Sequence, residues 1–224
     1  MNLVDDIKKQ FPNYEELASA AFNHQHNLWG RPMYQGNTVF QDLKSRRGTG
    51  DSAVTTRLQV IDLFNAGNFY EGYLCALVWG NIGTFQNGRQ HFNAAFSVPK
   101  KDVETKIKNI KNLISQNKLG DAFDSMCKGG VNNFPGVGVS FFTKLLYFIG
   151  ATVNCNVKPL ILDSVSLRIL NRIRADKGIT REARQTRMDY LEFCNEMNAL
   201  SQQLSLPSAG HLEAFLFNDG KVLI

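Results

Sequence analysis

Residues 134–140 read Phe-Pro-Gly-Val-Gly-Val-Ser, and the apolar stretch FFTKLLYFIG follows directly at residues 141–150. The two glycines allow a sharp turn and a close approach of the backbone to another molecule. The apolar stretch is predicted to be a helix that begins at Ser140 or in the turn before it. Free N–H groups in its first turn then point outward, with the positive end of the helix dipole behind them. Such a turn is a ready site for a phosphate group.

A carboxylate stands at the start of the next predicted helix. A polar connector leads to Lys-Pro-Leu-Ile-Leu-Asp at residues 158–163, and a helical pattern resumes at residues 164–170. Asp163 is therefore predicted to be an N-cap, because an aspartate there accepts hydrogen bonds from the first N–H groups of a helix. Capping alone is one explanation for this residue, and capping is compatible with a catalytic role.

The hairpin, the apolar helix and Asp163, taken together, resemble the helix-hairpin-helix DNA glycosylases. The wording SFFTKLLYF at residues 140–148 is most similar to a bacterial branch described as 8-oxoguanine-glycosylase-like. A weaker likeness extends over most of the chain. The resemblance implies that double-stranded DNA is bound through hairpin amides and that Asp163 is the catalytic carboxylate. It also implies that a monovalent cation can sit on the hairpin carbonyls. The DNA-binding hairpin residues would be Gly136, Val137, Gly138, Val139 and Ser140.

Composition is that of a globular protein that can bind a polyanion. The chain has 224 residues, a net charge of +5 and a pI near 9.0. No stretch reaches the roughly 18 apolar residues that a membrane span needs. The acidic first residues, Met1 to Asp6, lack the apolar core of a signal peptide. We therefore expect a cytoplasmic protein, acting as a monomer, with no membrane partner.

The four cysteines are scattered, and no Cys-x-x-Cys pair is present. This spacing argues against a zinc site and against a disulfide framework. Some glycosylases of the resembled superfamily hold an iron–sulfur cluster on four closely spaced cysteines, and that spacing is absent here. We expect buried free thiols, no required cofactor and no metal site besides the monovalent cation. The cysteines are Cys75, Cys127, Cys155 and Cys194.

Apolar residues recur with helical spacing, and no alternating strand pattern extends over more than a few residues, so the predicted fold class is all-α. The resemblance implies a glycosylase fold of two helical lobes with a DNA-binding cleft between them. One lobe is assigned to residues 54–178, with the hairpin and Asp163, and the other to residues 1–53 and 179–224. The predicted helices are residues 2–10, 14–28, 54–65, 69–79, 102–118, 121–128, 141–150, 164–174, 180–204 and 209–217.

Two polar loops are candidates for DNA contact. In the resembled superfamily, a loop after a helix supplies side chains that fill the space left by a flipped base. The loop after Trp79 offers Asn81, Phe85, Gln86 and Asn87 for that role, or it is only a glycine-rich helix end. The basic loop at residues 44–50 offers Arg46 and Arg47 for phosphate contacts, or it is a solvated connector. The candidates for the pocket of the flipped base are Trp79, Phe85 and Phe141, with Trp29 and Tyr147 as further aromatic residues.

The attacking group has two candidates, water and a lysine. Superfamily members that also nick the strand carry a lysine two residues after the second hairpin glycine, and this position is Ser140 here. The sequence therefore predicts a monofunctional enzyme in which water attacks. Lys144, one helical turn beyond Ser140, is the alternative nucleophile. Phe142 is also larger than the residue usual at its position. His211 and Glu213 are assigned structural roles.

The sequence is compatible with three functions. The first is excision of a damaged base, with 8-oxoguanine suggested by the resembled branch. The second is excision of a hypermodified base, such as glucosylated hydroxymethylcytosine, from phage DNA. The third is a DNA-binding module without catalysis, which would need the two glycines but not Asp163.

Overall fold

The computed structural model describes residues 2–23, 38–39, 41–42, 56–80 and 88–224. These residues form eleven α-helices, one 3-10 helix and no strand, which confirms the predicted all-α fold. None of the described helices has both the length and the apolar character that crossing a membrane requires. The elements are α1 (Leu3–Gln10), α2 (Tyr14–Phe22), α4 (Arg57–Asn65), α5 (Phe69–Trp79), α6 (Gly88–Phe96), α7 (Lys100–Ser115), α8 (Leu119–Met126), α9 (Val139–Ala151), α10 (Ser164–Asp176), α11 (Arg187–Gln203), α12 (Ala209–Asn218) and η3 (Gly220–Leu223).

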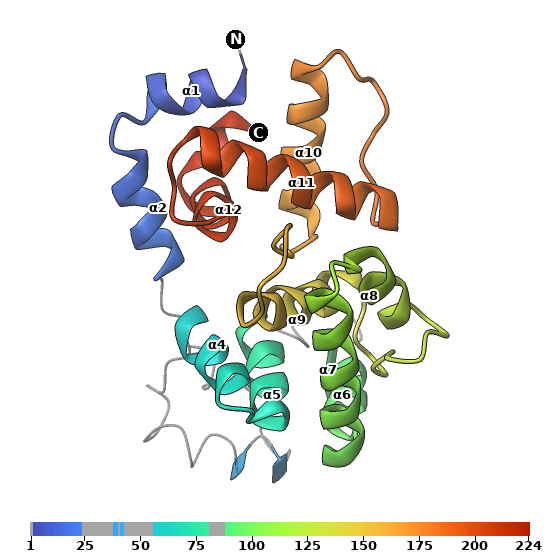
Figure 1. Cartoon of the computed structure of the whole chain (residues 1–224). Helices are drawn as coiled ribbons and strands as arrows, with labels where there is room; N and C mark the ends of the chain where they lie inside the picture. The colour runs from blue at the N-terminus through green and yellow to red at the C-terminus, as the bar shows by residue number, and fades with distance from the viewer. Residues whose placement is uncertain (1, 24–37, 40, 43–55, 81–87) are drawn as a thin grey trace.

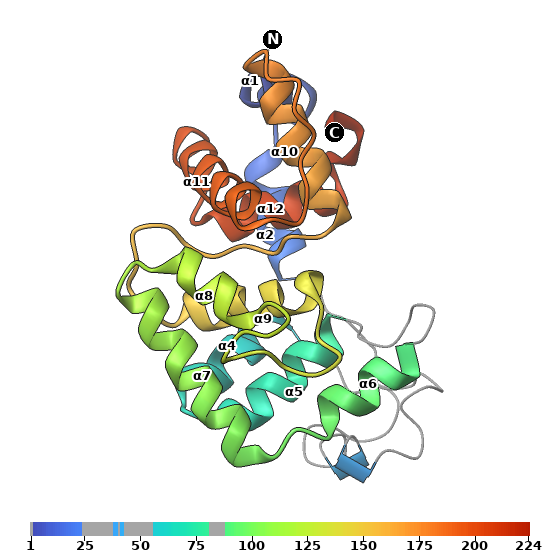
Figure 2. The ribbon, with the colours of Figure 1, turned by 90° about the vertical axis from the view of Figure 1, so that its right-hand side faces the viewer.

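The helices lie in two groups (Figure 1). Helices α4 to α9 form the lower group, and α1, α2, α10, α11 and α12 form the upper group, a division that Figure 2 shows from the side. Helix α10 packs on α1, α11 and α12. The helix after Asp163 therefore lies with the terminal helices, whereas the sequence analysis places residues 164–178 in the central lobe. The chain passes from one group to the other in the segment between α9 and α10.

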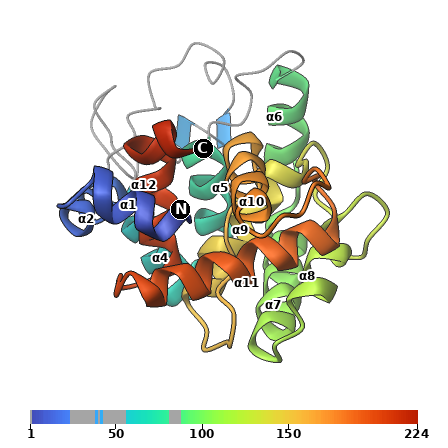
Figure 3. The ribbon, with the colours of Figure 1, turned by 90° about the horizontal axis from the view of Figure 1, so that it is seen from above.

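Helix α9 is the centre of the lower group. It packs against α4, α5, α7 and α8, and its residues from Leu145 to Gly150 are all buried. A helix that is apolar on every side needs neighbours on every side, which explains this central position. Helix α11 runs across the molecule to reach α8, so the upper group also covers one helix of the hairpin (Figure 3).

Helix α2 ends at Phe22 instead of residue 28, α7 is shifted by two to three residues, and two further elements differ more from the sequence prediction. Helix α6 is not predicted, because glycine and polar residues interrupt the apolar spacing of GRQHFNAAF, yet Phe92 and Phe96 are buried and stack at 4.2 Å. Helix α11 begins at Arg187 instead of residue 180. The backbone N–H of Ala183 donates to the Asn171 side chain at 2.7 Å, and Thr186 caps the helix. These contacts hold the preceding residues in an irregular segment.

Candidate active site

The turn between α8 and α9 is built by side chains that bind its backbone. The Asn133 side chain donates to the Met126 carbonyl at 2.9 Å, and Lys106 of α7 donates to the Asn133 carbonyl. Gly136 has φ +74°, and a Cβ there would lie 2.5 Å from the carbonyl oxygen of His91 in α6. Only glycine fits this position, because both the left-handed backbone and the close approach exclude a side chain.

The first turn of α9 leaves its amides open. Gly138 is the N-cap residue, it is exposed, and a Cβ there would meet no atom within 4 Å. In the part of the chain that the structure describes, no acceptor is recorded for the backbone N–H of Gly138, Val139 or Ser140. The side chain of Val137, the residue before this turn of helix, is by contrast buried. These three N–H groups can bind an anion at the positive end of the helix.

Phe142 is accommodated between the hairpin helices and not excluded from them. Its ring meets the edge of Phe123 in α8 at 5.0 Å, and Phe123 in turn stacks on Tyr190 of α11 at 4.8 Å. All three rings are buried. An aromatic pair therefore joins α8 to α9 where a small residue was expected.

Asp163 caps α10 with one of its two carboxylate oxygens. Oδ1 accepts the backbone N–H groups of Val165 at 2.9 Å and Ser166 at 3.1 Å, and it also accepts the Ser166 hydroxyl at 3.3 Å. Among the described residues, Oδ2 has no hydrogen-bond partner. The residue is partly exposed. Capping thus orients the carboxylate and leaves one oxygen for a ligand.

Lys144 reaches back along α9 to Ser140. Its Nζ donates to the Ser140 carbonyl at 2.9 Å and to the Ser140 hydroxyl at 3.3 Å, and it lies 5.1 Å from the Phe141 ring. Gly80, at the end of α5, makes room for the Lys144 stem, because a Cβ there would lie 2.6 Å from Lys144 Cδ. Burial lowers the pKa of Lys144, the negative charges of Asp163 and Glu213 oppose this, and Arg57 adds to it.

Arg57 and Glu213 form a buried ion pair next to Lys144. Nη1 of Arg57 in α4 lies 3.2 Å from Oε2 of Glu213 in α12, and the two residues are 6% and 3% exposed. The guanidinium carbon lies 4.9 Å from the Trp79 ring and 5.2 Å from the Tyr147 ring. Burial raises the pKa of Glu213, while the neighbouring Arg57 lowers it.

This pair is not predicted from the sequence, where Glu213 receives a structural role and Arg57 receives none. One feature of the sequence does indicate a buried partner for Glu213. Glu213 is the only charged residue in the helix AGHLEAFLFN, and its neighbours Leu212 and Ala214 are buried. An acid in such a helix needs a partner. His211 stacks on Phe22 at 4.0 Å and bonds Ser208, as a structural residue would.

The other predicted site residues divide into two sets. Trp79 and Phe141 lie beside Arg57 and Lys144 respectively. The remaining candidates fall outside the described residues: Trp29, Arg46, Arg47, Asn81, Phe85, Gln86 and Asn87.

Two parts of the structure are relevant to metal binding, namely the possible side-chain ligands and the hairpin carbonyls. Within the described chain, no three His, Cys, Asp or Glu residues are grouped as metal ligands, and none of the four cysteines forms a disulfide. Two hairpin carbonyls already have donors, since Lys106 binds Asn133 and the Val137 N–H binds Phe134 at 3.1 Å. We derive no step through the monovalent cation that the resemblance implies.

Comparison with known families places this all-helical chain in a class. The model of the family described as "Putative 8-oxoguanine DNA glycosylase OGG-like protein" matches residues 22–217. Because the match covers most of the chain, the protein belongs to this family. The matched range includes Arg57, Lys144, Asp163 and Glu213. No curated protein and no solved structure gives a significant match. The family description is that of a DNA glycosylase and therefore implies DNA as the substrate.

Proposed function

We propose that the protein is a DNA N-glycosylase that flips a modified base out of the duplex and cleaves its glycosidic bond. The observation that carries this proposal is the grouping of Asp163, with a free Oδ2, and the Lys144 amine near the open amides of α9. Cleavage builds positive charge on the deoxyribose, and a fixed carboxylate stabilises that charge. The amides would hold a phosphate of the same strand. Family membership supports the class of reaction.

The contacts of Lys144 favour the amine over water as the attacking group. Its Nζ lies 3.3 Å from the Ser140 hydroxyl, so the Lys144 side chain reaches back to the residue that stands where the superfamily carries its lysine. The lowered pKa of Lys144 increases the uncharged fraction of the amine, which is the form that attacks. This proposal replaces the monofunctional prediction, which rested on Ser140 alone.

The proposed step is a substitution at C1′ of the deoxyribose. The nitrogen lone pair of Lys144 forms a bond to C1′ while the bond from C1′ to the base breaks. The electron pair of that bond leaves with the base, which takes up a proton. The lysine nitrogen then loses a proton, O4′ takes one up, and the sugar ring opens to a protonated Schiff base. Removal of a proton from C2′ expels the 3′ phosphate and nicks the strand.

The first test is base release and strand cleavage on a panel of DNAs. The panel holds 8-oxoguanine, uracil, alkylated purines, hydroxymethylcytosine and glucosylated hydroxymethylcytosine, and each reaction is repeated with borohydride. We expect release of the oxidised purine and a trapped adduct that Lys144→Gln abolishes. Release only of the phage-type bases would assign the protein to defence. Base release without an adduct would restore water as the nucleophile. Tight DNA binding without release of any base would identify the protein as a DNA-binding module without catalysis.

Asp163→Asn is the matched variant for this test. Asparagine caps helices about as well as aspartate, so α10 should keep its start and its stability. Excision should nevertheless fall by orders of magnitude, because the charge that stabilises the sugar is gone. DNA affinity should persist. Full activity of Asp163→Asn would contradict the proposed mechanism.

A further inference from the structure

We propose that Arg57 and Glu213 are positioning residues that set the electrostatic surroundings of the Lys144 amine. This inference rests on the proposed function, in which that amine attacks the sugar. The pair would touch neither the sugar nor the base and would act through Lys144 alone.

The contacts of Arg57 hold the ion pair in one geometry. Arg57 lies among three aromatic rings, with its guanidinium carbon 4.9 Å from Trp79, 5.2 Å from Tyr147 and 5.8 Å from Phe22. Its charge is also held by Glu213 at 3.2 Å. Removing one partner of such a buried pair leaves the other charge without compensation. The pair therefore presents a fixed, nearly neutral unit to its surroundings.

The charges that face Lys144 come from three other elements. Asp163 stands before α10. Arg57 of α4 lies on the rings of Trp79, the residue before Gly80, and of Tyr147, one turn beyond Lys144 on α9. Glu213 of α12 pairs with Arg57, and all three charges act on the pKa of Lys144. Helix α5 contributes the uncharged Gly80 at the lysine stem. On α9 itself, Lys144 bonds Ser140. Two carboxylates thus favour the charged ammonium, and Arg57 is the one described cation that opposes them.

The role of Tyr147 and His211 is indirect. Tyr147 faces Arg57 and Glu213, and burial raises its pKa, so it remains a neutral phenol. Burial and Arg57 both lower the pKa of His211, so it is favoured in its neutral form. Neither group adds charge beside the amine near neutral pH.

Substitutions of the two residues should move the pKa of Lys144 in opposite directions. Without Arg57, the one described cation that disfavours the ammonium is gone, so the pKa of Lys144 should rise. This rise is limited, because the buried Glu213 then takes up a proton more readily. Without the charge of Glu213, Arg57 is no longer offset, so the pKa of Lys144 should fall. The fall in Glu213→Gln should be the larger of the two shifts, because Arg57 keeps its charge without a partner. In the double variant Arg57→Gln/Glu213→Gln the two shifts should largely cancel.

The first readout needs no DNA. The native protein is acetylated with trace acetic anhydride across a pH series, and mass spectrometry follows the Lys144 peptide against exposed Lys101 as the internal reference. The labelling midpoint of Lys144 should rise in Arg57→Gln and fall in Glu213→Gln. Thermal unfolding of each variant identifies loss of fold. Arg57→Lys keeps the charge and should restore the midpoint even if the aromatic packing is poorer.

The second readout is the pH dependence of borohydride trapping on the preferred substrate, whose midpoint should move with that of labelling. Arg172→Gln removes an arginine from another ion pair, with Asp6, and should leave both midpoints unchanged. Equal midpoints in the wild type, Arg57→Gln and Glu213→Gln would overturn the inference. Shifted labelling without any trapped adduct would support the pair's influence on Lys144 but overturn the amine mechanism.

Discussion

Thr143 and Leu162 are joined by a buried hydrogen bond. The Thr143 hydroxyl accepts the backbone N–H of Leu162 at 3.0 Å and donates to the Val139 carbonyl at 2.8 Å. Thr143 immediately precedes Lys144, and Leu162 immediately precedes Asp163. The bond therefore fixes the segment that carries the carboxylate against the helix that carries the amine.

Thr143→Val should weaken both the fold and the reaction. Valine keeps the shape but leaves the buried Leu162 N–H without an acceptor, which costs about 1–3 kcal/mol. Urea unfolding should show this loss, and single-turnover excision should slow because Asp163 is less firmly placed. Thr143→Ser keeps the hydroxyl and serves as the control. If the valine variant matched the wild type in both assays, the bond would not be what positions Asp163.

The two hairpin glycines should respond differently to alanine. Gly136→Ala introduces a Cβ at φ +74° and 2.5 Å from the His91 carbonyl, so the free protein should lose at least about 1–2 kcal/mol of stability. Gly138→Ala meets no neighbour, so the melting temperature should not change. It should still weaken binding to all DNA sequences alike, because a methyl group obstructs phosphate contacts. Sequence-selective loss of affinity in Gly138→Ala would argue against phosphate binding at this turn.

Gly80→Ala should affect Lys144 more than the fold. The backbone of Gly80 is helical, so alanine is tolerated there, but its Cβ would lie 2.6 Å from Lys144 Cδ. The lysine stem must move, and its Nζ should leave Ser140. We expect less borohydride-trapped adduct at a melting temperature close to that of the wild type. Unchanged trapping would show that the contact with Ser140 is not needed for the reaction.

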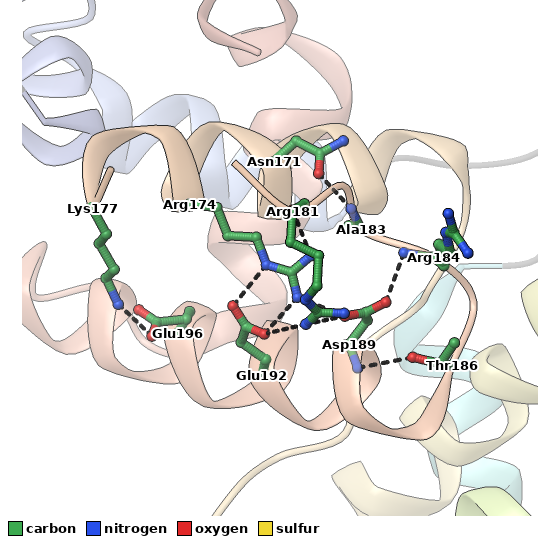
Figure 4. A network of polar contacts seen from close by, with 10 residues as sticks. All are labelled: Asn171, Arg174, Lys177, Arg181, Ala183, Arg184, Thr186, Asp189, Glu192 and Glu196. Atoms are coloured by element: carbon green, nitrogen blue, oxygen red, sulfur yellow. Dashed lines mark hydrogen bonds and ion pairs between the residues drawn. The ribbon is translucent and has the colours of Figure 1, made fainter. Parts of the chain in front are cut away.

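A charged network joins α10 to α11 far from this site (Figure 4). Arg174 is 1% exposed and binds Asp189 at 2.6 Å and Glu192 at 2.5 Å, while Arg181 also binds Asp189 at 2.8 Å. Hydrogen bonds from Arg174 lower the pKa of Glu192. Burial would raise the pKa of Asp189, but bonds from Arg174 and from the Arg184 N–H lower it overall.

This network should make the fold sensitive to acid. Carboxylates with lowered pKa values in the folded state contribute stability above their ordinary pKa values of 3.8 and 4.5. That contribution is lost as the pH falls through the lowered values. Arg174→Met should cost about 3–5 kcal/mol near neutral pH, because it leaves Asp189 with less compensation. Its melting temperature should also depend less on pH below about 4.5. Glu196→Gln, in the more exposed pair with Lys177, is the control and should change little.

Local sequence signals predict most of the helices and one half of the site. Apolar spacing predicts both the first and the last residue of α5. The position of Asp163 before a helical pattern predicts that it caps that helix. The open amides at Gly138 follow from the glycine turn and the apolar helix behind it. These features depend on neighbours in the chain, which is why the sequence is sufficient for them.

Contacts between distant segments could not be predicted in the same way. Whether α10 joins the central or the terminal helices depends on which faces pack, and a single sequence does not give that. The partner of Glu213 is Arg57, 156 residues away, and nothing local to Arg57 marks it as buried. The direction of the Lys144 side chain depends on the space that Gly80 leaves on another helix.

The charges around Lys144 come from distant parts of the chain, and this has a consequence for partly folded molecules. Arg57, Lys144, Asp163 and Glu213 come from four separate segments and both groups of helices. Any opening that separates α12 from α4 breaks the ion pair before the remaining helices need to unfold. A molecule that is incompletely folded would then lack the ordered surroundings of its amine and its carboxylate. The proposed reaction would therefore require the complete assembly of both groups of helices.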